Sequence, residues 1–89
     1  MRAIVTVVGR DRVGIIAGVS ALLAGHGANI LDVTQTILDS YFTMMMLVDT
    51  SGCSLTFAEL ADALEKSGAQ LNLSVRIQRE DIFEAMHRI

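Results

Sequence analysis

Residues 9–16 read Gly-Arg-Asp-Arg-Val-Gly-Ile-Ile and join a valine-rich run to a segment with helical periodicity. The valines before this stretch predict a short strand. Asp11 suits a helix N-cap, because its carboxylate can accept a hydrogen bond from a free first-turn N–H. Gly14 then falls in the first helical turn, where the missing Cβ lets another molecule approach bare backbone donors.

The start of this first predicted helix favours a bound anion. The helix dipole adds partial positive charge there, so a small carboxylate would be stabilised by it. Two interpretations stay open at this point: a carboxylate site, or a capped helix in which Gly14 serves packing alone. Asp11 is favoured as the N-cap over a direct contact with a ligand, because a capping carboxylate is already engaged.

The chain is small and apolar. Its 89 residues are 52% hydrophobic, and the mean hydropathy is +0.48. One domain of this size cannot hide all of that apolar surface, so we expect some of it to meet a second copy. No apolar run is long enough for a transmembrane helix, and the N-terminus lacks the apolar core of a signal peptide. The single cysteine, Cys53, rules out an internal disulfide and fits a reducing cytoplasm.

The charge pattern excludes one class of partner. The net charge is −3, and the seven Lys and Arg residues are scattered along the chain. Direct nucleic-acid binding needs a basic stripe to neutralise phosphates, and none is visible. Proline is absent and no segment resembles a linker, so we expect a single compact unit.

Periodicity and turn residues predict seven elements. They are strands over 2–8, 29–38, 41–49 and 70–79, and helices over 12–26, 56–68 and 80–89. Gly25 and Gly27 mark the end of the first helix. Thr56 and Glu59 form a capping box for the second. Its end is expected at Gly68.

Leu55 and Leu60 stand at the positions of a hydrophobic staple around that capping box. In the last strand we expect Leu71, Leu73 and Val75 to alternate inward with polar residues outward. The final segment, 80–89, is predicted to be a short amphipathic helix beyond a domain over 1–79.

The order βαββαβ gives an α+β fold. Two split β-α-β units with right-handed crossovers make a four-stranded antiparallel sheet of order 4-1-3-2, with two helices on one face. The edge strands alternate apolar with polar residues, whereas the central strands are apolar on both faces. A sheet covered on one side would alternate throughout. We therefore expect the helix over 80–89, from this chain or a partner, to cover the second face.

Two motifs in this order carry a family resemblance. Gly-Arg-Asp-Arg-Val-Gly-Ile-Ile-Ala at 9–17 and Gly-Ala-Asn-Ile at 27–30 resemble the ACT domain, a small regulatory ligand-binding module, over residues 2 to about 79. The continuation at 31–36, the strand beginning Tyr-Phe-Thr-Met at 41–44 and the tail at 77–89 are similar to stand-alone bacterial and archaeal ACT proteins of the UPF0237 type. Those resemble in turn the ACT halves of the glycine-cleavage-system repressor.

The resemblance implies a ferredoxin-like sandwich, a homodimer and an amino-acid site between the first strand–helix loop of one subunit and its partner. The implied ligand-binding residues are Asp11, Val13, Gly14, Ile15, Asn29 and Ile30. Backbone N–H groups around Gly14 could hold an α-carboxylate. The Asn29 amide could face an α-ammonium with its oxygen and a carboxylate with its NH₂. An equally open alternative makes Asn29 a left-handed turn residue. Many ACT domains have proline where this chain has Val13, so here the loop is less rigid.

No catalytic, metal or cofactor site is predicted. Cys53 has no histidine near it in sequence, and His26 and His87 lack a third metal ligand. An acylphosphatase-like hydrolase needs an arginine in a glycine-bearing phosphate cradle, and the first loop is a thin match to it. The expected function is a cytoplasmic, non-enzymatic regulator that binds a small amino acid or related metabolite and signals to a partner protein. A ligand-free assembly module is the alternative.

Overall fold

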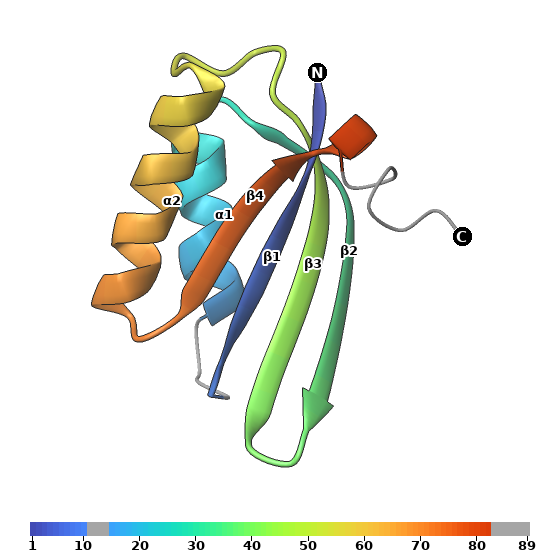
Figure 1. Cartoon of the computed structure of the whole chain (residues 1–89), viewed down its shortest axis with the longest axis vertical. Helices are drawn as coiled ribbons and strands as arrows, with labels where there is room; N and C mark the ends of the chain where they lie inside the picture. Colours follow the sequence, from blue (N-terminus) through green and yellow to red (C-terminus); the bar gives the residue numbers. More distant parts are fainter. Residues whose placement is uncertain (11–14, 83–89) are drawn as a thin grey trace.

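The computed structural model describes residues 1–10 and 15–82, with side chains in the first helix from Ala17 onward. Its elements, in chain order, are β1 (Arg2–Arg10), α1 (Ile15–Gly25), β2 (Asn29–Leu38), β3 (Tyr41–Asp49), α2 (Phe57–Gln70) and β4 (Ser74–Arg79) (Figure 1). Residues 80–82 form a helical turn. The predicted strands over 29–38 and 41–49 are confirmed to the residue, whereas β1 continues two residues beyond its predicted end.

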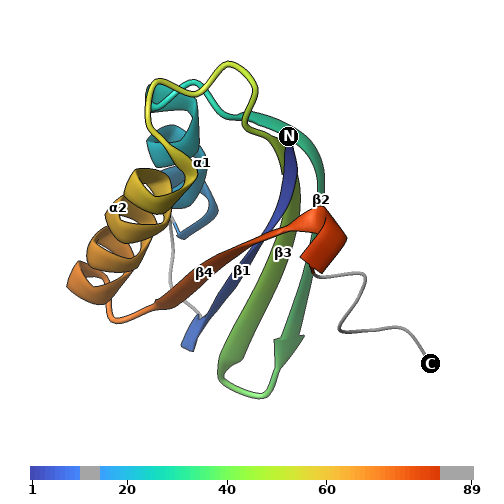
Figure 2. The same ribbon diagram turned by 45° about the horizontal axis from the view of Figure 1, so that its top comes forward.

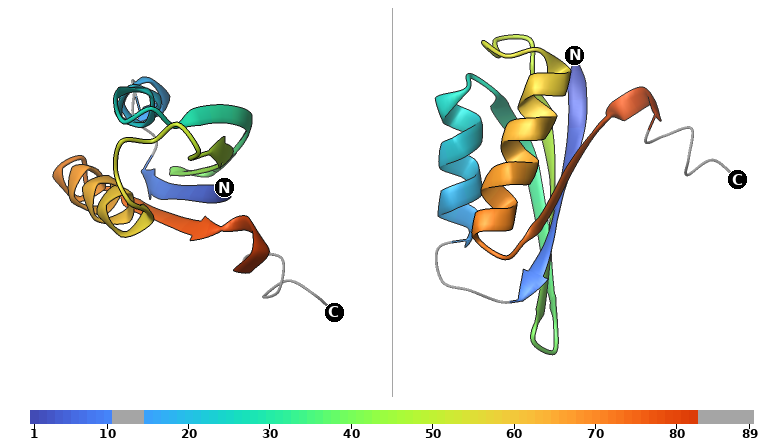
Figure 3. Two further views of the ribbon diagram at one scale, coloured as in Figure 1. Left: turned by 90° about the horizontal axis from the view of Figure 1, so that it is seen from above. Right: turned by 60° about the vertical axis from the view of Figure 1, so that its left-hand side comes forward.

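The four strands form one sheet in the order β2-β3-β1-β4, with every neighbouring pair antiparallel. This is the predicted order 4-1-3-2. Both helices cover the same face of the sheet, α1 towards β2 and α2 towards β4 (Figures 2 and 3). The described residues therefore form a two-layer α+β sandwich, in which one face of the sheet is covered by the helices and the other is open.

The core lies between the helices and the covered face. The pleat sends alternate residues of each strand to the same side, and the register pairs Val5 with Met46 and Val7 with Met44. All four side chains are completely buried. From the helices, Leu23 and Leu60 are buried against them. One of the two apolar faces expected for the central strands therefore supplies the core.

The start of α2 confirms the predicted capping box. The Thr56 hydroxyl accepts a hydrogen bond from the Glu59 N–H at 3.2 Å, and the Glu59 carboxylate accepts one from the Thr56 N–H at 3.0 Å. The bond from the Thr56 N–H to the carboxylate is the main reason that the pKa of the Glu59 carboxyl is lowered, and the Thr56 side chain adds to it. Leu60 is buried and Leu55 packs against the core, as expected of a hydrophobic staple.

The predicted end of α2 at Gly68 is wrong. The helix continues to Gln70, and Gly68 lies inside it, buried. A Cβ at Gly68 would approach Cγ2 of Val75 to 2.5 Å, so this glycine permits close packing of α2 on β4. Packing, not helix termination, explains the residue.

The predicted start of the last strand at residue 70 is also wrong, because α2 continues to Gln70 and β4 begins only at Ser74. Residues beyond the extended helix form a turn in which Asn72 has φ 60°, the left-handed conformation that ends many helices. Leu71 lies in this turn and is 40% exposed, not inward as expected. Leu73 and Val75 are buried as predicted.

The end of α1 follows the prediction. The helix ends at Gly25, and Gly27 takes φ 84°. A Cβ at Gly27 would lie 2.5 Å from the carbonyl oxygen of Gly52, so the left-handed turn also needs a residue without a side chain.

Candidate functional site

The predicted carboxylate site falls mostly outside the described residues. Asp11, Val13 and Gly14 belong to the range 11–14, so the capping role of Asp11 stays a prediction. Ile15 is the first residue of α1. The described part of α1 therefore begins next to the residues for which the sequence predicts exposed backbone donors.

The second half of the predicted site begins β2. Asn29 is the first residue of that strand and its side chain is exposed. It is not among the residues with positive φ, whereas Gly27 is. The interpretation of Asn29 as a left-handed turn residue is therefore wrong, and Gly27 fills that role. Ile30 is half-buried against the core, so its side chain belongs to packing.

The two halves lie at opposite ends of one subunit. Asn29 lies level with Arg2, since both pair with the same residue of β3, and Leu38 lies level with Arg10 in the same way. The nine residues of β1 separate these levels by about 26 Å at the usual rise per residue. Because α1 begins after Arg10 and ends before Asn29, its first turn is at the far end from the asparagine (Figure 1).

A carboxylate that the sequence did not single out lies beside Asn29. Asp49 pairs with Asn29 across β2 and β3. Its Oδ1 accepts hydrogen bonds from the Ser51 hydroxyl at 2.6 Å and the Ser51 N–H at 2.9 Å, and the Met1 ammonium is 3.6 Å away. The two bonds from Ser51 are the main reason that the pKa of Asp49 is lowered. The pairing could not be found locally, because these residues are far apart in sequence.

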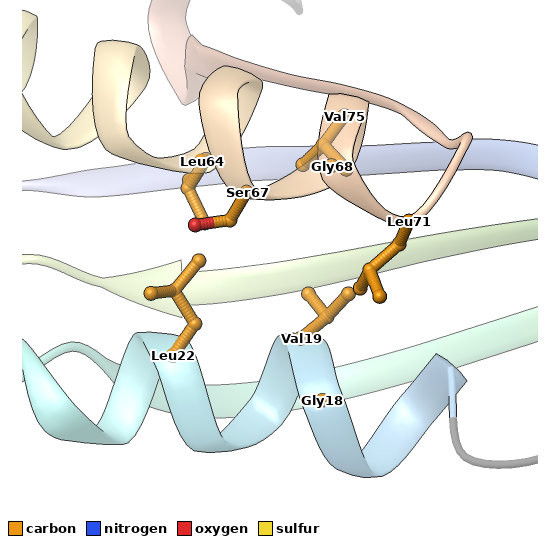
Figure 4. A pocket seen from close by; sticks show the side chains of 8 residues that line it. All are labelled: Gly18, Val19, Leu22, Leu64, Ser67, Gly68, Leu71 and Val75. Carbon is orange, nitrogen blue, oxygen red and sulfur yellow. The ribbon is translucent and has the colours of Figure 1, made fainter.

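A hollow of about 140 Å³ opens between the two helices. Its lining is Gly18, Val19, Leu22, Leu64, Ser67, Gly68, Leu71 and Val75. Figure 4 shows Val19 and Leu22 of α1 facing Leu64, Ser67 and Leu71 across the gap. The Ser67 hydroxyl is the one polar side chain in this lining. A zwitterionic amino acid needs partners for two charges, so this hollow suits an apolar group instead.

A wider groove of about 510 Å³ follows β4 and the adjoining side of α2. Glu65 and Arg76 contribute opposite charges to its lining, and both side chains are exposed. The groove is a second place where a zwitterion could find both of its partners. It contains none of the residues that the sequence motifs single out.

The described residues 1–10 and 15–82 contain no group of three or more His, Cys, Asp or Glu side chains that could hold a metal ion. Within the same ranges, no helix is both long and apolar enough to cross a membrane.

The fold and its strand order define a class of protein, the small two-layer α+β sandwiches of ferredoxin-like topology, and comparison with known proteins identifies the family. A model of the ACT domain matches residues 2–78. The chain is 53% identical over 88 residues to the UPF0237 protein MJ1558 of Methanocaldococcus jannaschii, covering 99% of this chain and 98% of the relative. It is 52% identical to the UPF0237 protein lin0537 of Listeria innocua, over the full length of both.

Solved structures agree with this match. An ACT domain protein from Streptococcus pneumoniae superposes with a TM-score of 0.84 and 49% identity, covering 98% of each chain. A putative glycine cleavage system transcriptional repressor superposes with a TM-score of 0.73 and 28% identity, covering 86% of this chain and 44% of the repressor. The chain belongs to the ACT domain family, in its UPF0237 branch.

Proposed function

We propose that the protein is a cytoplasmic, non-enzymatic regulator that binds a small amino acid or related metabolite between two copies of the chain. Its bound state would pass to a partner protein. The observation that carries the proposal is the separation of Asn29 from the first turn of α1 within one subunit. A site made of both needs a second copy.

The outer edge of β2 supports pairing of two copies. The strand is ten residues long and lies at the edge of the sheet, so no strand of the described part of the chain pairs with its outer N–H and C=O groups. Leu31, Val33 and Ile37 are all more than 40% exposed on it. Such an apolar edge strand is a template for another strand, and a second copy satisfies it symmetrically.

Antiparallel pairing of two β2 strands would bring the halves of the site together. The partner subunit's Asn29 would then lie level with Leu38 of the first chain, at the end where β1 finishes. The first turn of α1 is at that end, and α1 contacts β2. Each dimer would hold two equivalent sites, each with backbone donors from one chain and an asparagine from the other.

The chemistry of such a site suits an α-amino acid. Backbone N–H groups at a helix start, together with the dipole, bind a carboxylate. The asparagine amide offers an oxygen to the ammonium. Two charged ends of one small ligand would thus be bound by two chains, and occupancy would stabilise the dimer.

Thermal melting against single amino acids tests binding. A ligand at roughly 100 times its dissociation constant adds about 2.7 kcal/mol of stability, which for a chain of this size raises the melting temperature by roughly 10–20 °C. Asn29→Ala should abolish the shift. Glu65→Ala, in the groove along β4, is the matched control and should keep it. Melting curves that no amino acid moves would contradict the proposal.

Mixed dimers test whether the site is shared. Gly14→Asp adds a repelling carboxylate at the helix start, and each variant alone should lose binding. In a mixed dimer of Gly14→Asp and Asn29→Ala chains, one site would carry both substitutions and the other neither. Half of the sites should therefore recover. If no site recovers, the two residues do not belong to one site made by two chains.

A ligand-free assembly module is the second candidate function, and the exposed apolar residues of β2 favour it. For an assembly module we expect the chain to dimerise and its melting temperature to be unaffected by amino acids. Sedimentation would then show a dimer for the wild type and its loss in a Val33→Lys variant. Thermal melting of both proteins would show no shift with any amino acid.

A further inference from the structure

The face of the sheet opposite the helices is partly apolar. Ile4, Met45 and Leu47 project from the central strands on this side, because the register pairs Ile4 with Leu47 and the pleat alternates with the buried residues. All three are half-buried, although no helix among the described elements covers them. They line a hollow of about 170 Å³ that reaches Asp32 and Thr34 of β2.

The chain leaves the sheet beside this open face. Figure 3 shows the helical turn at residues 80–82 on the side of the sheet away from α1 and α2. Arg2 and Glu80 form an ion pair at 3.1 Å, which holds the turn against the start of β1. Asp81 is bound by the Arg79 guanidinium through two hydrogen bonds, at 2.7 and 3.2 Å.

The hollow lies at the level of this exit. Gln78 of β4 pairs with Ile4, Ile4 pairs with Leu47, and Leu47 pairs with Asp32 of β2. These four residues form one row across all four strands, and the member of the row on β4, Gln78, is two residues before Glu80. A segment that continued from the turn across the sheet would meet the hollow directly.

The remaining sequence has the pattern of a segment that packs on one side. Ile82, Phe83, Met86 and Ile89 follow the spacing i, i+1, i+4, i+7, which gathers apolar side chains on one face of a helix. Glu84, His87 and Arg88 fall between them. Ile82, the described member of the set, is 46% exposed.

We propose that residues 80–89 form a helix that crosses the open face of their own chain along this row and covers Ile4, Met45 and Leu47. The length fits: ten residues of helix span about 15 Å, and three strand spacings from β4 to β2 span about 14 Å. The helix therefore ends over β2, at the hollow.

The charges on the two surfaces are complementary. Asp32 lines the far end of the hollow, where the helix would bring Arg88. Arg76 pairs with Thr6, so it lies on the open face near the β4 side, where the helix would bring Glu84. A helix of the opposite direction would set like charges against each other. The two ion pairs therefore favour a helix that runs from β4 towards β2, while the apolar contacts supply most of the stability of its packing on the sheet.

The three consecutive methionines provide the test. Met44 and Met46 lie on the covered face, whereas Met45 lies on the open face. In methyl-labelled full-length protein, NMR should give a through-space contact between Met45 and Met86. Removing residues 83–89 should shift the Met45 methyl signal and leave Met44 and Met46 unchanged. If Met45 does not respond and has no contact with Met86, the proposal is wrong.

Two further variants keep the test decisive. Should the truncated chain not fold, Phe83→Ser in the full chain is expected to shift Met45 in the same selective way. To identify which chain covers the face, Met45→Cys and Met86→Cys are combined with Cys53→Ser and oxidised. An intramolecular disulfide supports the proposal. A disulfide-linked dimer means that the helix of a second copy covers the face, and absence of both products means that neither does; either result overturns it.

Discussion

The two faces of the sheet differ in how deeply their apolar residues are buried. Those on the face under the helices are fully buried, whereas those on the open face are only half-buried. Met44 and Met46 are completely buried under the helices, and Met45 between them is not. The three side chains are chemically identical and adjacent in sequence. Their difference shows that composition alone does not rank positions by their importance to stability. The importance of each position to stability depends instead on what packs against its face of the sheet.

The largest expected effect separates the two faces directly. Met46→Ala should lower the free energy of unfolding by roughly 2–5 kcal/mol, because it leaves a cavity in a close-packed core. Met45→Ala should cost less than about half as much, since the sheet buries this side chain only in part and no close-packed core surrounds it. Urea unfolding of both variants measures the difference. Equal losses would erase the contrast between the faces.

The second prediction concerns how closely the helical layer approaches the sheet. Gly68→Ala should destabilise the protein by about 1–3 kcal/mol through overpacking against Val75. Gly25→Ala is the control, because no other part of the fold lies within 4 Å of the position that a Cβ would take there; it should change stability by roughly 0.5 kcal/mol or less. Thermal unfolding compares the two. A neutral Gly68→Ala would mean that α2 can move off β4 without cost.

The third prediction tests the local start of the covering helix. Thr56→Ala removes the acceptor for the Glu59 N–H and should cost about 1 kcal/mol. Thr56→Ser keeps a hydroxyl and should recover most of that loss. The denaturation midpoints of the two variants, compared with that of the wild type, measure the loss and its recovery. A harmless Thr56→Ala would indicate that tertiary packing alone fixes the beginning of α2.

The smallest effect is that of acid. No polar or charged residue among the described ones is buried, so acid sensitivity there comes from the exposed carboxylates. Folding lowers the pKa of Glu59 from its ordinary 4.5 and that of Asp49 from 3.8. A lowered pKa stabilises the fold above the ordinary value, and that contribution disappears as the pH falls through the folded value.

Melting temperatures should therefore decline gently below about pH 4.5, and the decline should be shallower in Glu59→Gln. A variant that loses stability as steeply as the wild type would show that capping at Glu59 does not contribute. A steep transition in the wild type would point to a buried charge instead, against the apolar character of the covered face.

Most of the architecture could be predicted because it is written in local patterns. The apolar run of β3, the capping box at Thr56 and the turn at Gly27 each depend on residues within a few positions of one another. The order of strands then follows from short connections and right-handed crossovers. The motifs also singled out Asn29 and the start of α1 as parts of a ligand site, which stays a prediction, and one of the two roles considered for Asn29 proved wrong.

The sequence by itself determined the element types, their order and the existence of two apolar faces, because periodicity reports which side of a strand or helix avoids water. Only the tertiary structure decided where α2 ends, since Gly68 is required by contact with Val75 and not by the helix itself. It also placed Asn29 and the described start of α1 at opposite ends of one chain. Strand register sets that distance, and register is a property of paired strands, not of any single segment.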